Sequence, residues 1–192
     1  MGRWQPNARE RLVIAAVDLF SEQGYDETTV AQITDRAGVT KSTFFRHFPD
    51  KRELLVAGQA TLSGLLAEGI ASAPTAAGPL DAIAAGLTRA SQTLGPANHE
   101  LGPRLEALIA SSTELQERSI LKGVGLANAM SQALRARGVP DAIARLAAEM
   151  GLLAFHQGFV TWSSSPQGDG KELARLTVAA LDELRTAAAS LT

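Results

Sequence analysis

The apolar residues near the N-terminus repeat with the spacing of short helices. Val30, Ile33 and Ala37 fall at positions i, i+3 and i+7, which places them on one stripe of a helix. Gly38 is expected to end this helix, because glycine adopts the left-handed conformation that closes a helix without steric cost. Thr40 then offers a hydroxyl to cap a second helix that begins at Lys41. The pattern predicts two short helices joined by a tight turn.

The second of these helices is expected to have one apolar and one polar side. Phe44 and Phe48, four residues apart, form the apolar anchor. The remaining side chains are mostly hydrogen-bonding groups, namely Lys41, Ser42, Thr43, Arg46 and His47. A helix of this kind fits the major groove of duplex DNA, which is roughly 12 Å wide. The alternative is an ordinary helix pair that turns a corner in an all-α protein.

Helical periodicity continues along the whole chain, which predicts an all-α fold. A first helix over residues 8–23, closed by Gly24, would pack behind the helix pair and complete a three-helix unit. Pro49 stops the second helix of the pair, and Asp50 can cap the next one. Further helices are expected at 51–72, 80–94, 100–111, 113–137, 141–163 and 171–191, with a loop rich in small residues at 73–79.

Charge and composition narrow the classes of function. The 192 residues are 45% hydrophobic and 20% charged, which is ordinary for a globular protein, and there is no cysteine. Residues 1–52 carry a net charge of +1 and residues 53–192 a net charge of -3. Five cations lie between residues 36 and 52, namely Arg36, Lys41, Arg46, Lys51 and Arg52, against a single acid. This distribution favours a phosphate-binding surface at the helix pair, although a solvated face is the alternative.

Several features of other classes are missing from the sequence. The three histidines lie far apart without metal-ligand spacing, so neither a metal nor a cofactor is expected. No phosphate-binding glycine loop or nucleophile motif is present, which makes a helical enzyme the weakest interpretation. No signal peptide or clear membrane span is found, so a cytoplasmic location is expected.

The first third of the chain resembles the tetracycline-repressor (TetR-type) family of transcriptional regulators. The resemblance rests on matched residues at fixed spacing: Ala15-Ala16, Leu19-Phe20, Gly24-Tyr25, Thr28-Thr29-Val30, Ile33, Ala37-Gly38-Val39, Thr43-Phe44-Phe45 and Phe48-Pro49-Asp50-Lys51. It implies an N-terminal three-helix DNA-binding domain over residues 9–69. It also implies a C-terminal helical domain over residues 70–192 for effector binding and dimerisation.

The resemblance and the residue chemistry together define an expected DNA-binding set. Thr29, His47, Lys51 and the neighbourhood of Phe45 correspond to phosphate contacts in the family. Lys41, Ser42, Thr43 and Arg46 are the candidates for base-edge or mixed contacts. The complete set is Thr28, Thr29, Arg36, Thr40, Lys41, Ser42, Thr43, Phe45, Arg46, His47 and Lys51. Phe45 stands where the family often has tyrosine, and without a hydroxyl it is expected only to pack.

The C-terminal half is expected to form a dimer and to bind a small molecule. Apolar residues surround the helices at 141–163 and 171–191, more than one core-facing side requires, so a second subunit should cover the excess. The resemblance implies a four-helix bundle there. Candidate ligand-binding residues are Asn98, His99, Arg104, Asn128, Phe155, His156, Phe159 and Trp162. The prediction is a repressor released from a palindromic operator by an unknown ligand. The alternative is a DNA-binding protein that is constitutive or regulated by a partner.

Overall fold

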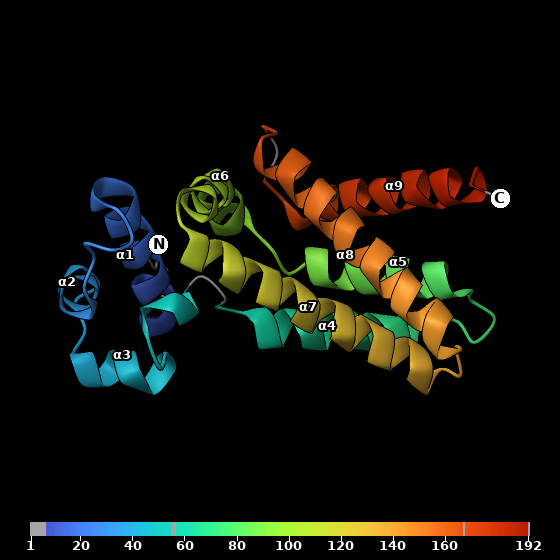
Figure 1. The fold of residues 1–192 in the computed structure, drawn as a ribbon, viewed down its shortest axis with the longest axis horizontal. Helices are drawn as coiled ribbons and strands as arrows, with labels where there is room; N and C mark the ends of the chain where they lie inside the picture. The colour runs from blue at the N-terminus through green and yellow to red at the C-terminus, as the bar shows by residue number, and fades with distance from the viewer. Residues whose placement is uncertain (1–6, 55–56, 167, 192) are drawn as a thin grey trace, which may run out of the picture. The chain divides into compact units, whose positions relative to one another are not determined.

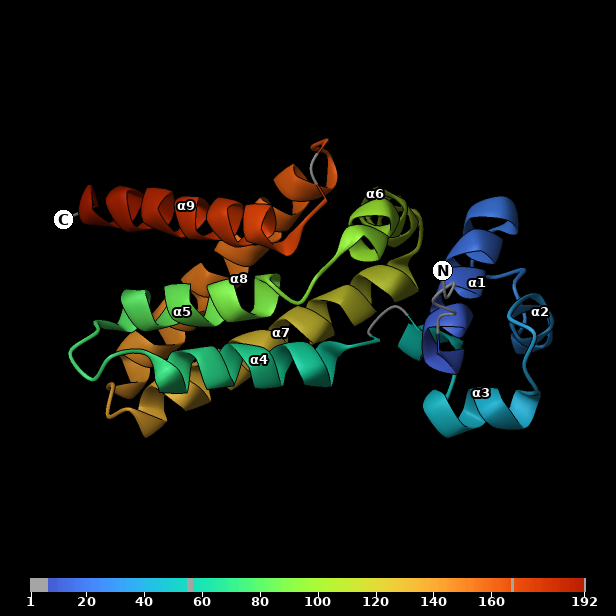
Figure 2. The same cartoon turned by 180° about the vertical axis from the view of Figure 1, so that it is seen from behind.

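The computed structural model describes residues 7–54, 57–166 and 168–191, and all regular structure in these residues is helical (Figures 1 and 2). The elements are α1 (Ala8–Gln23), α2 (Val30–Arg36), α3 (Lys41–His47), the short 3-10 helix η1 (Lys51–Leu54), α4 (Gln59–Ser72), α5 (Pro79–Ser91), α6 (Pro96–Ser111), α7 (Thr113–Ala136), α8 (Asp141–Ser163) and α9 (Gly170–Ala189). The expected all-α fold is confirmed.

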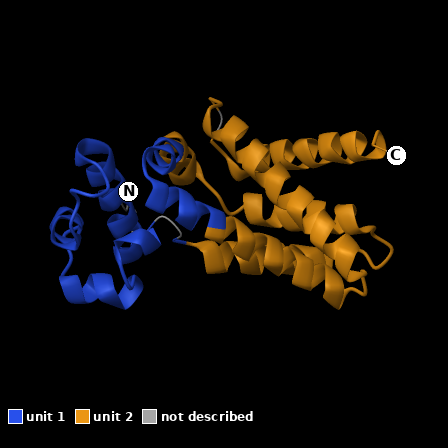
Figure 3. Ribbon diagram, in the orientation of Figure 1, with its two compact units in different colours: residues 1–57, 104–120 blue, residues 58–103, 121–192 orange. Residues whose placement is uncertain are grey.

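The chain divides into two compact units, which are coloured separately in Figure 3. Unit 1 comprises residues 1–57 and 104–120, and unit 2 comprises residues 58–103 and 121–192. This division differs from the expected boundary between residues 69 and 70. The whole of α4 belongs to unit 2, whereas the end of α6 and the start of α7 belong to unit 1.

The core of unit 1 forms where α1, α2 and α3 meet. Leu12, Phe20, Ile33 and Phe44 are at most 2% exposed, so each helix contributes at least one fully buried side chain. The Phe44 and Phe48 rings lie 5.8 Å apart. Burying side chains of this size stabilises a fold by about 1.5–3 kcal/mol each. The three helices are therefore fixed against one another mainly by their apolar sides.

The expected continuous helix from residue 51 to residue 72 is wrong. Asp50 does cap the first turn, since its Oδ1 accepts from the backbone N–H groups of Arg52 at 2.8 Å and Glu53 at 3.3 Å. That turn is the short η1, however, and α4 begins after Gly58, whose φ of +88° lies in the left-handed region. Residues 55 and 56 lie outside the described residues.

Unit 2 is built around α5. Its backbone packs closely against α4, α8 and α9, and α8 also pairs with α9. Glycines allow the closest approaches: a Cβ at Gly69 on α4 would lie 2.6 Å from Cα of Gly86 on α5. Similarly, a Cβ at Gly158 on α8 would lie 2.6 Å from Cγ2 of Thr177 on α9. The apolar core spreads over all of these helices and includes Leu126 and Met130 of α7.

Helices α4 and α7 lie side by side in both views, and they run in the same direction (Figures 1 and 2). At the start of α4, the Gln59 amide lies against α7 at Gly125. Near the other end, Arg137 donates hydrogen bonds to the carbonyls of Ile70 at 3.2 Å and Ala73 at 2.9 Å.

By length and composition alone, the stretch Lys51–Ser72 is apolar enough to cross a membrane. Packed core helices meet the same criterion, and Ile70 of α4 is fully buried.

Candidate nucleic-acid interface

Both helices of the expected pair are capped at their N-termini by threonine. Thr29 Oγ1 accepts from the backbone N–H of Gln32 at 3.3 Å, and Gln32 Oε1 accepts from the backbone N–H of Thr29 at 2.8 Å, which completes a capping box. Thr40 Oγ1 accepts from the backbone N–H of Thr43 at 3.1 Å. Between the helices, Gly38 has a φ of +63°. The predicted helix, turn and helix are therefore confirmed together with the turn residue and both caps.

Helix α3 presents a buried side and an exposed side, as its sequence predicts. Phe44 is fully buried and Phe48, directly after the helix, is 2% exposed. Lys41, Ser42 and Arg46 are exposed, at the spacing that places them on one side of the helix. Within α3 there is no acidic residue. The exposed side is therefore cationic and rich in hydrogen-bond donors.

Phe45 lies in the middle of this exposed side, and this differs from the packing role expected from sequence. Its ring meets Phe44 edge-on at 5.2 Å between centroids, but 57% of the residue is exposed. It falls four residues after Lys41 and one before Arg46. A large aromatic surface is thus presented to solvent between two cations. Thr43 and His47, at the edges of the exposed side, are half-buried.

Thr28 does not belong to the exposed set. The residue is 1% exposed, and its hydroxyl donates to the carbonyl of Gly24 at 2.7 Å and accepts from the Gln23 amide at 3.2 Å. The hydroxyl therefore holds the loop between α1 and α2. The expectation that Thr28 contacts DNA is corrected, because a buried hydroxyl with two partners cannot reach a phosphate.

Lys51 is also engaged inside unit 1. Its ammonium donates to the backbone carbonyls of Tyr25 at 2.7 Å, Thr28 at 3.1 Å and Asp26 at 3.4 Å. The same nitrogen lies 4.1 Å from the centre of the Tyr25 ring. Three acceptors match the three donors of an ammonium group. In this arrangement Lys51 stabilises the loop after α1, whereas sequence analysis assigned it to a phosphate.

Arg36 forms an ion pair on the surface. Its guanidinium donates to both carboxylate oxygens of Glu22, at 2.9 and 2.8 Å, and both side chains are largely exposed. The hydrogen bond from Arg36 lowers the pKa of the Glu22 carboxyl. Exposed ion pairs of this kind contribute little to stability. Arg36 thus differs from Lys41: Arg36 is paired with Glu22, whereas Lys41 has no ion-pair partner in the described part of the chain.

Residues 104–120 contact the N-terminal helices through polar side chains. Arg104, expected to line a ligand site, instead pairs with Asp18 of α1 at 2.7 Å. Glu114 accepts from the Tyr25 hydroxyl at 3.2 Å, and Arg118 pairs with Glu53 of η1. Burial, with Glu114 as a second cause, raises the pKa of Tyr25. The start of α7 is thus tied to the loop and the turn that flank the helix pair.

Four of the expected ligand-binding residues form one row of rings in unit 2. His99 meets Trp162 edge-on at 5.0 Å, Trp162 lies 5.5 Å from Phe159, and Phe159 stacks at 6.2 Å on Phe155. Trp162 is fully buried and donates its indole N–H to the carbonyl of Asp169 at 2.9 Å. Its role is therefore to anchor the turn between α8 and α9.

His99 also holds the turn after α8, since its Nε2 lies 2.9 Å from the carbonyl of Ser165. The other expected ligand-binding residues do not join the row of rings. Asn98 is exposed, and its side chain accepts from the backbone N–H of Gly95 at 3.2 Å. Asn128 and His156 are exposed. The expected set of eight residues is therefore not gathered around one cavity.

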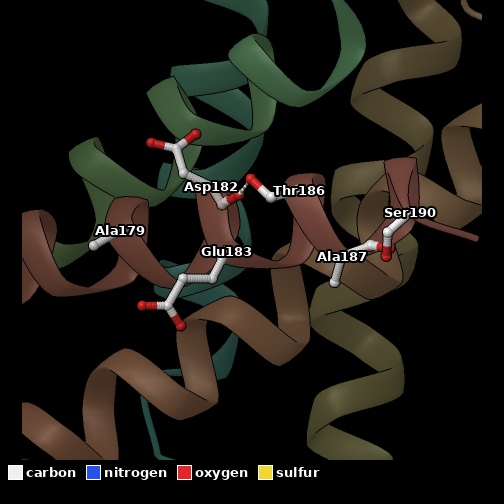
Figure 4. A pocket seen from close by; sticks show the side chains of 6 residues that line it. All are labelled: Ala179, Asp182, Glu183, Thr186, Ala187 and Ser190. Carbon is white, nitrogen blue, oxygen red and sulfur yellow. Dashed lines mark hydrogen bonds between the residues drawn. The ribbon is translucent and has the colours of Figure 1, made fainter.

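The outer side of α9 carries a wide, shallow hollow, shown in Figure 4. Its volume is about 670 Å³, and it is open to solvent along one side of the helix. The lining residues are Ala179, Asp182, Glu183, Thr186, Ala187 and Ser190. None of the expected ligand-binding residues is among them. The lining combines small side chains with two carboxylates, and a hollow this open does not enclose a small molecule.

Lys122 of unit 2 was not among the residues expected from the sequence. It is half-buried, and burial lowers the pKa of its ammonium. The sequence signal that could have identified Lys122 is its spacing from the apolar residues of α7. Lys122 follows the buried Leu115 by seven residues and precedes the buried Leu126 by four, which places it on the core-facing stripe. Among the described residues it has neither an ion pair nor a hydrogen bond from its side chain.

Comparison with known proteins identifies the N-terminal part of the chain. Residues 12–57 match the family described as bacterial regulatory proteins, tetR family. These residues belong to the tetR family. They contain most of α1, all of α2 and α3, and η1, so the matched segment coincides with the helix pair and its supports. The expected resemblance is therefore confirmed for this domain.

A curated relative gives the same result over a somewhat longer stretch. The chain is 35% identical over 75 residues to the HTH-type transcriptional regulator TcmR of Streptomyces glaucescens, covering 39% of this chain and 33% of that protein. The chain thus matches about a third of that relative's length.

Solved structures extend the likeness to the whole fold. A transcriptional regulator from Aquifex aeolicus has a TM-score of 0.55 at 17% identity, covering 94% of this chain and 99% of that one. The SmeT–triclosan complex has a TM-score of 0.57 at 22% identity, covering 95% and 91%. At these identities the likeness establishes a shared fold, with a tetR-family domain followed by a larger helical domain.

Two lysine variants separate stability from surface chemistry in the tetR-family domain. Lys51→Ala removes the donor from three carbonyls and is expected to cost about 2 kcal/mol of unfolding free energy, which lowers the denaturation midpoint in urea. Lys41→Ala is the matched control and should change that free energy by less than about 0.5 kcal/mol, because its side chain is exposed. Equal midpoints for Lys51→Ala and the unmodified protein would contradict the assigned role of Lys51.

Proposed function

We propose that this protein is a DNA-binding transcriptional regulator that acts as a homodimer, binds a two-fold symmetric operator and is released from it by a small molecule. The observation that carries the proposal is the exposed side of α3. Lys41, Ser42, Phe45 and Arg46 face solvent together, while Phe44 fixes the opposite side in the core. The tetR-family match of residues 12–57 supports the assignment.

The exposed side of α3 suggests distinct roles along the helix. Side chains near the N-terminus of a recognition helix reach base edges most readily, so Lys41 and Ser42 are assigned to bases. Arg46, one turn later, can bind guanine in a bidentate manner, which discriminates by about 1–3 kcal/mol. Thr29, Thr40, Thr43 and His47 flank this surface and are assigned to the phosphate backbone.

Exposed apolar residues on α8 support dimerisation. Ile143, Leu146, Leu153 and Val160 are 49%, 65%, 46% and 38% exposed. Together with Met150 and Gln157 they repeat at alternating steps of three and four residues, the spacing of a helix that packs along a partner helix. We call these six residues the α8 seam. The shallow hollow on α9 offers a second surface for a partner helix (Figure 4).

The fold supports a ligand-binding role for unit 2. A neighbour of the same fold was solved as a triclosan complex. In this chain, the helices of unit 2 enclose an apolar core that includes residues of α4, α5, α7, α8 and α9. A ligand that binds one conformation of unit 2 more tightly would shift the population of DNA-binding states. DNA and ligand would then weaken each other's binding by the same factor.

Selection of bound duplexes from a random pool tests the proposed function directly. The expected result is a two-fold symmetric sequence with half-sites about one helical turn, or roughly 34 Å, apart. Binding should weaken steeply as salt is raised, because phosphate contacts release counterions. Failure to enrich any sequence would refute the operator. An enriched asymmetric site would refute its recognition by a symmetric dimer.

Phe45 is expected to contact a thymine methyl group in the operator. Apolar side chains in the major groove read this methyl, and uracil lacks it. Replacing the contacted thymine by uracil should weaken binding about fourfold, which corresponds to about 0.8 kcal/mol for one buried carbon. Titrations of labelled duplexes, with uracil placed at one thymine at a time, would locate the contact.

The matched variants for this contact are Phe45→Ala and Ser42→Ala. Phe45→Ala should bind the thymine and uracil duplexes equally, whereas Ser42→Ala should retain the difference. If no thymine in the selected operator is sensitive to uracil, or if Phe45→Ala remains sensitive, Phe45 does not read the methyl.

Charged substitutions in the α8 seam should prevent dimerisation. Leu146→Glu with Leu153→Glu places two carboxylates on each side of the expected interface, where burial without a counter-charge costs several kcal/mol. Sedimentation equilibrium is expected to show monomers. Leu121→Glu is the control, since Leu121 is 56% exposed on α7 outside the seam. A dimeric seam variant, or dissociation of the control, would contradict the assigned interface.

A further inference from the structure

Lys122 projects from α7 between the directions of two neighbouring helices. Successive residues of an α-helix are rotated by about 100°. One residue after Lys122, a Cβ at Gly123 would lie 3.4 Å from Cδ2 of Leu152 on α8. Three residues after Lys122, Gly125 faces the Gln59 amide of α4. Viewed along the axis of α7, Lys122 lies about 60° from Gly125 on one side and about 100° from Gly123 on the other. Because Gly125 faces α4 and Gly123 faces α8, Lys122 lies between these two helices.

The same sector of α7 is its core-facing side. Leu126 lies about 40° from the direction of Lys122, and Met130 about 80°. Leu126 is 4% exposed and Met130 is 1% exposed, and both belong to the apolar core of unit 2. Lys122 therefore lies on the core-facing side of α7, where it is half-buried.

This placement leaves a cationic group without compensation. Burial lowers the pKa of the Lys122 ammonium, and the described residues supply no carboxylate or carbonyl partner for it. Lys122 is half-buried. A partly desolvated ammonium without a partner destabilises the fold relative to an apolar side chain of similar volume. The other three lysines differ, since Lys41 and Lys171 are exposed and Lys51 has three acceptors.

The surroundings of Lys122 add one polar group and an apolar wall. The Gln59 side chain is half-buried against α7 and has no hydrogen-bond partner among the described residues. Leu152 and Phe155, one turn apart on α8, pack against the core of unit 2. A site with one cation, one amide and aliphatic or aromatic walls matches a ligand that has one anionic end and an apolar body.

We propose that unit 2 binds an apolar monocarboxylate between α4, α7 and α8, with the carboxylate on the Lys122 ammonium and the Gln59 amide. The ligand's charge compensates the half-buried lysine, and its apolar body contacts Leu152 and Phe155. This inference deepens the proposed function, because it gives the chemical class of the small molecule.

Matched probes test the site without DNA. Hexanoate, octanoate and decanoate are the carboxylates, and 1-octanol is the neutral control for octanoate. Isothermal titration and thermal unfolding should show saturable binding of octanoate that is at least about tenfold tighter than that of 1-octanol, since the charge-assisted hydrogen bonds require the carboxylate.

Lys122→Met is the informative variant because it keeps the length of the side chain and removes the charge. It is expected to melt at a higher temperature than the unmodified protein when no ligand is present, which also verifies folding. Its preference for octanoate over 1-octanol should fall below about twofold. Lys171→Met removes an exposed lysine of α9 and should retain the full preference.

The proposal is overturned if none of the three carboxylates binds more tightly than 1-octanol. It is also overturned if Lys122→Met retains the preference, or if Lys171→Met loses it. Because these measurements contain no DNA, each of these results bears only on the ligand site and leaves the proposed operator binding unaffected. Conversely, a protein that binds octanoate through Lys122 but selects no duplex would retain this site and lose the proposed regulatory function.

Discussion

The burial of Phe44 and Phe48 is the interaction on which the tetR-family domain depends. Both rings lie in the core that α1 and α2 form with α3, and together they fix the rotation of α3 about its own axis. A helix of seven residues is too short to be stable alone in water. Its conformation is therefore set by its packing. Because the apolar side is held, Lys41 and Arg46 are presented on the opposite side, with no ion pair to another of the residues that the structure describes.

Polar side chains inside the domain serve this same geometry. Thr28 and Lys51 both satisfy backbone groups of the loop that follows α1, and that loop leads directly into α2. A loop carbonyl buried without a donor would cost about 1–3 kcal/mol. These two residues therefore stabilise the position of the helix pair, while the exposed residues of α3 stay available to a partner.

The local structure of the helix pair could be predicted from the sequence because its signals are local. Gly38, Thr40 and Asp50 act within three residues of their own positions, and each has the predicted conformation or cap. The break before α4 could not be predicted in this way. The apolar spacing from residue 51 onward fits one helix, whereas the structure places Gly58 in the left-handed region, and no pattern of apolar positions signals that break.

The functional assignments of single residues show the same limit. A lysine at a helix N-terminus and a threonine before a helix are typical phosphate-binding groups. In the structure, however, Lys51 donates to the carbonyl of Tyr25 in the loop after α1, and Thr28 donates to the carbonyl of Gly24. Trp162 was likewise expected to bind a ligand, whereas its indole N–H holds the turn before α9. Lys122 had a usable signal in its spacing, but a lysine among apolar positions is easily assigned to the surface.

The central claim is that Lys41 faces a partner and Lys51 faces the interior of its own domain. Residue-resolved acylation of lysines by mass spectrometry, with and without the selected duplex, measures this difference in one experiment. The account predicts that Lys41 reacts quickly in the free protein and is protected by the duplex, while Lys51 reacts slowly in both states. A rate at Lys41 that the bound duplex does not change, or a Lys51 as reactive as Lys41 in the free protein, would contradict it.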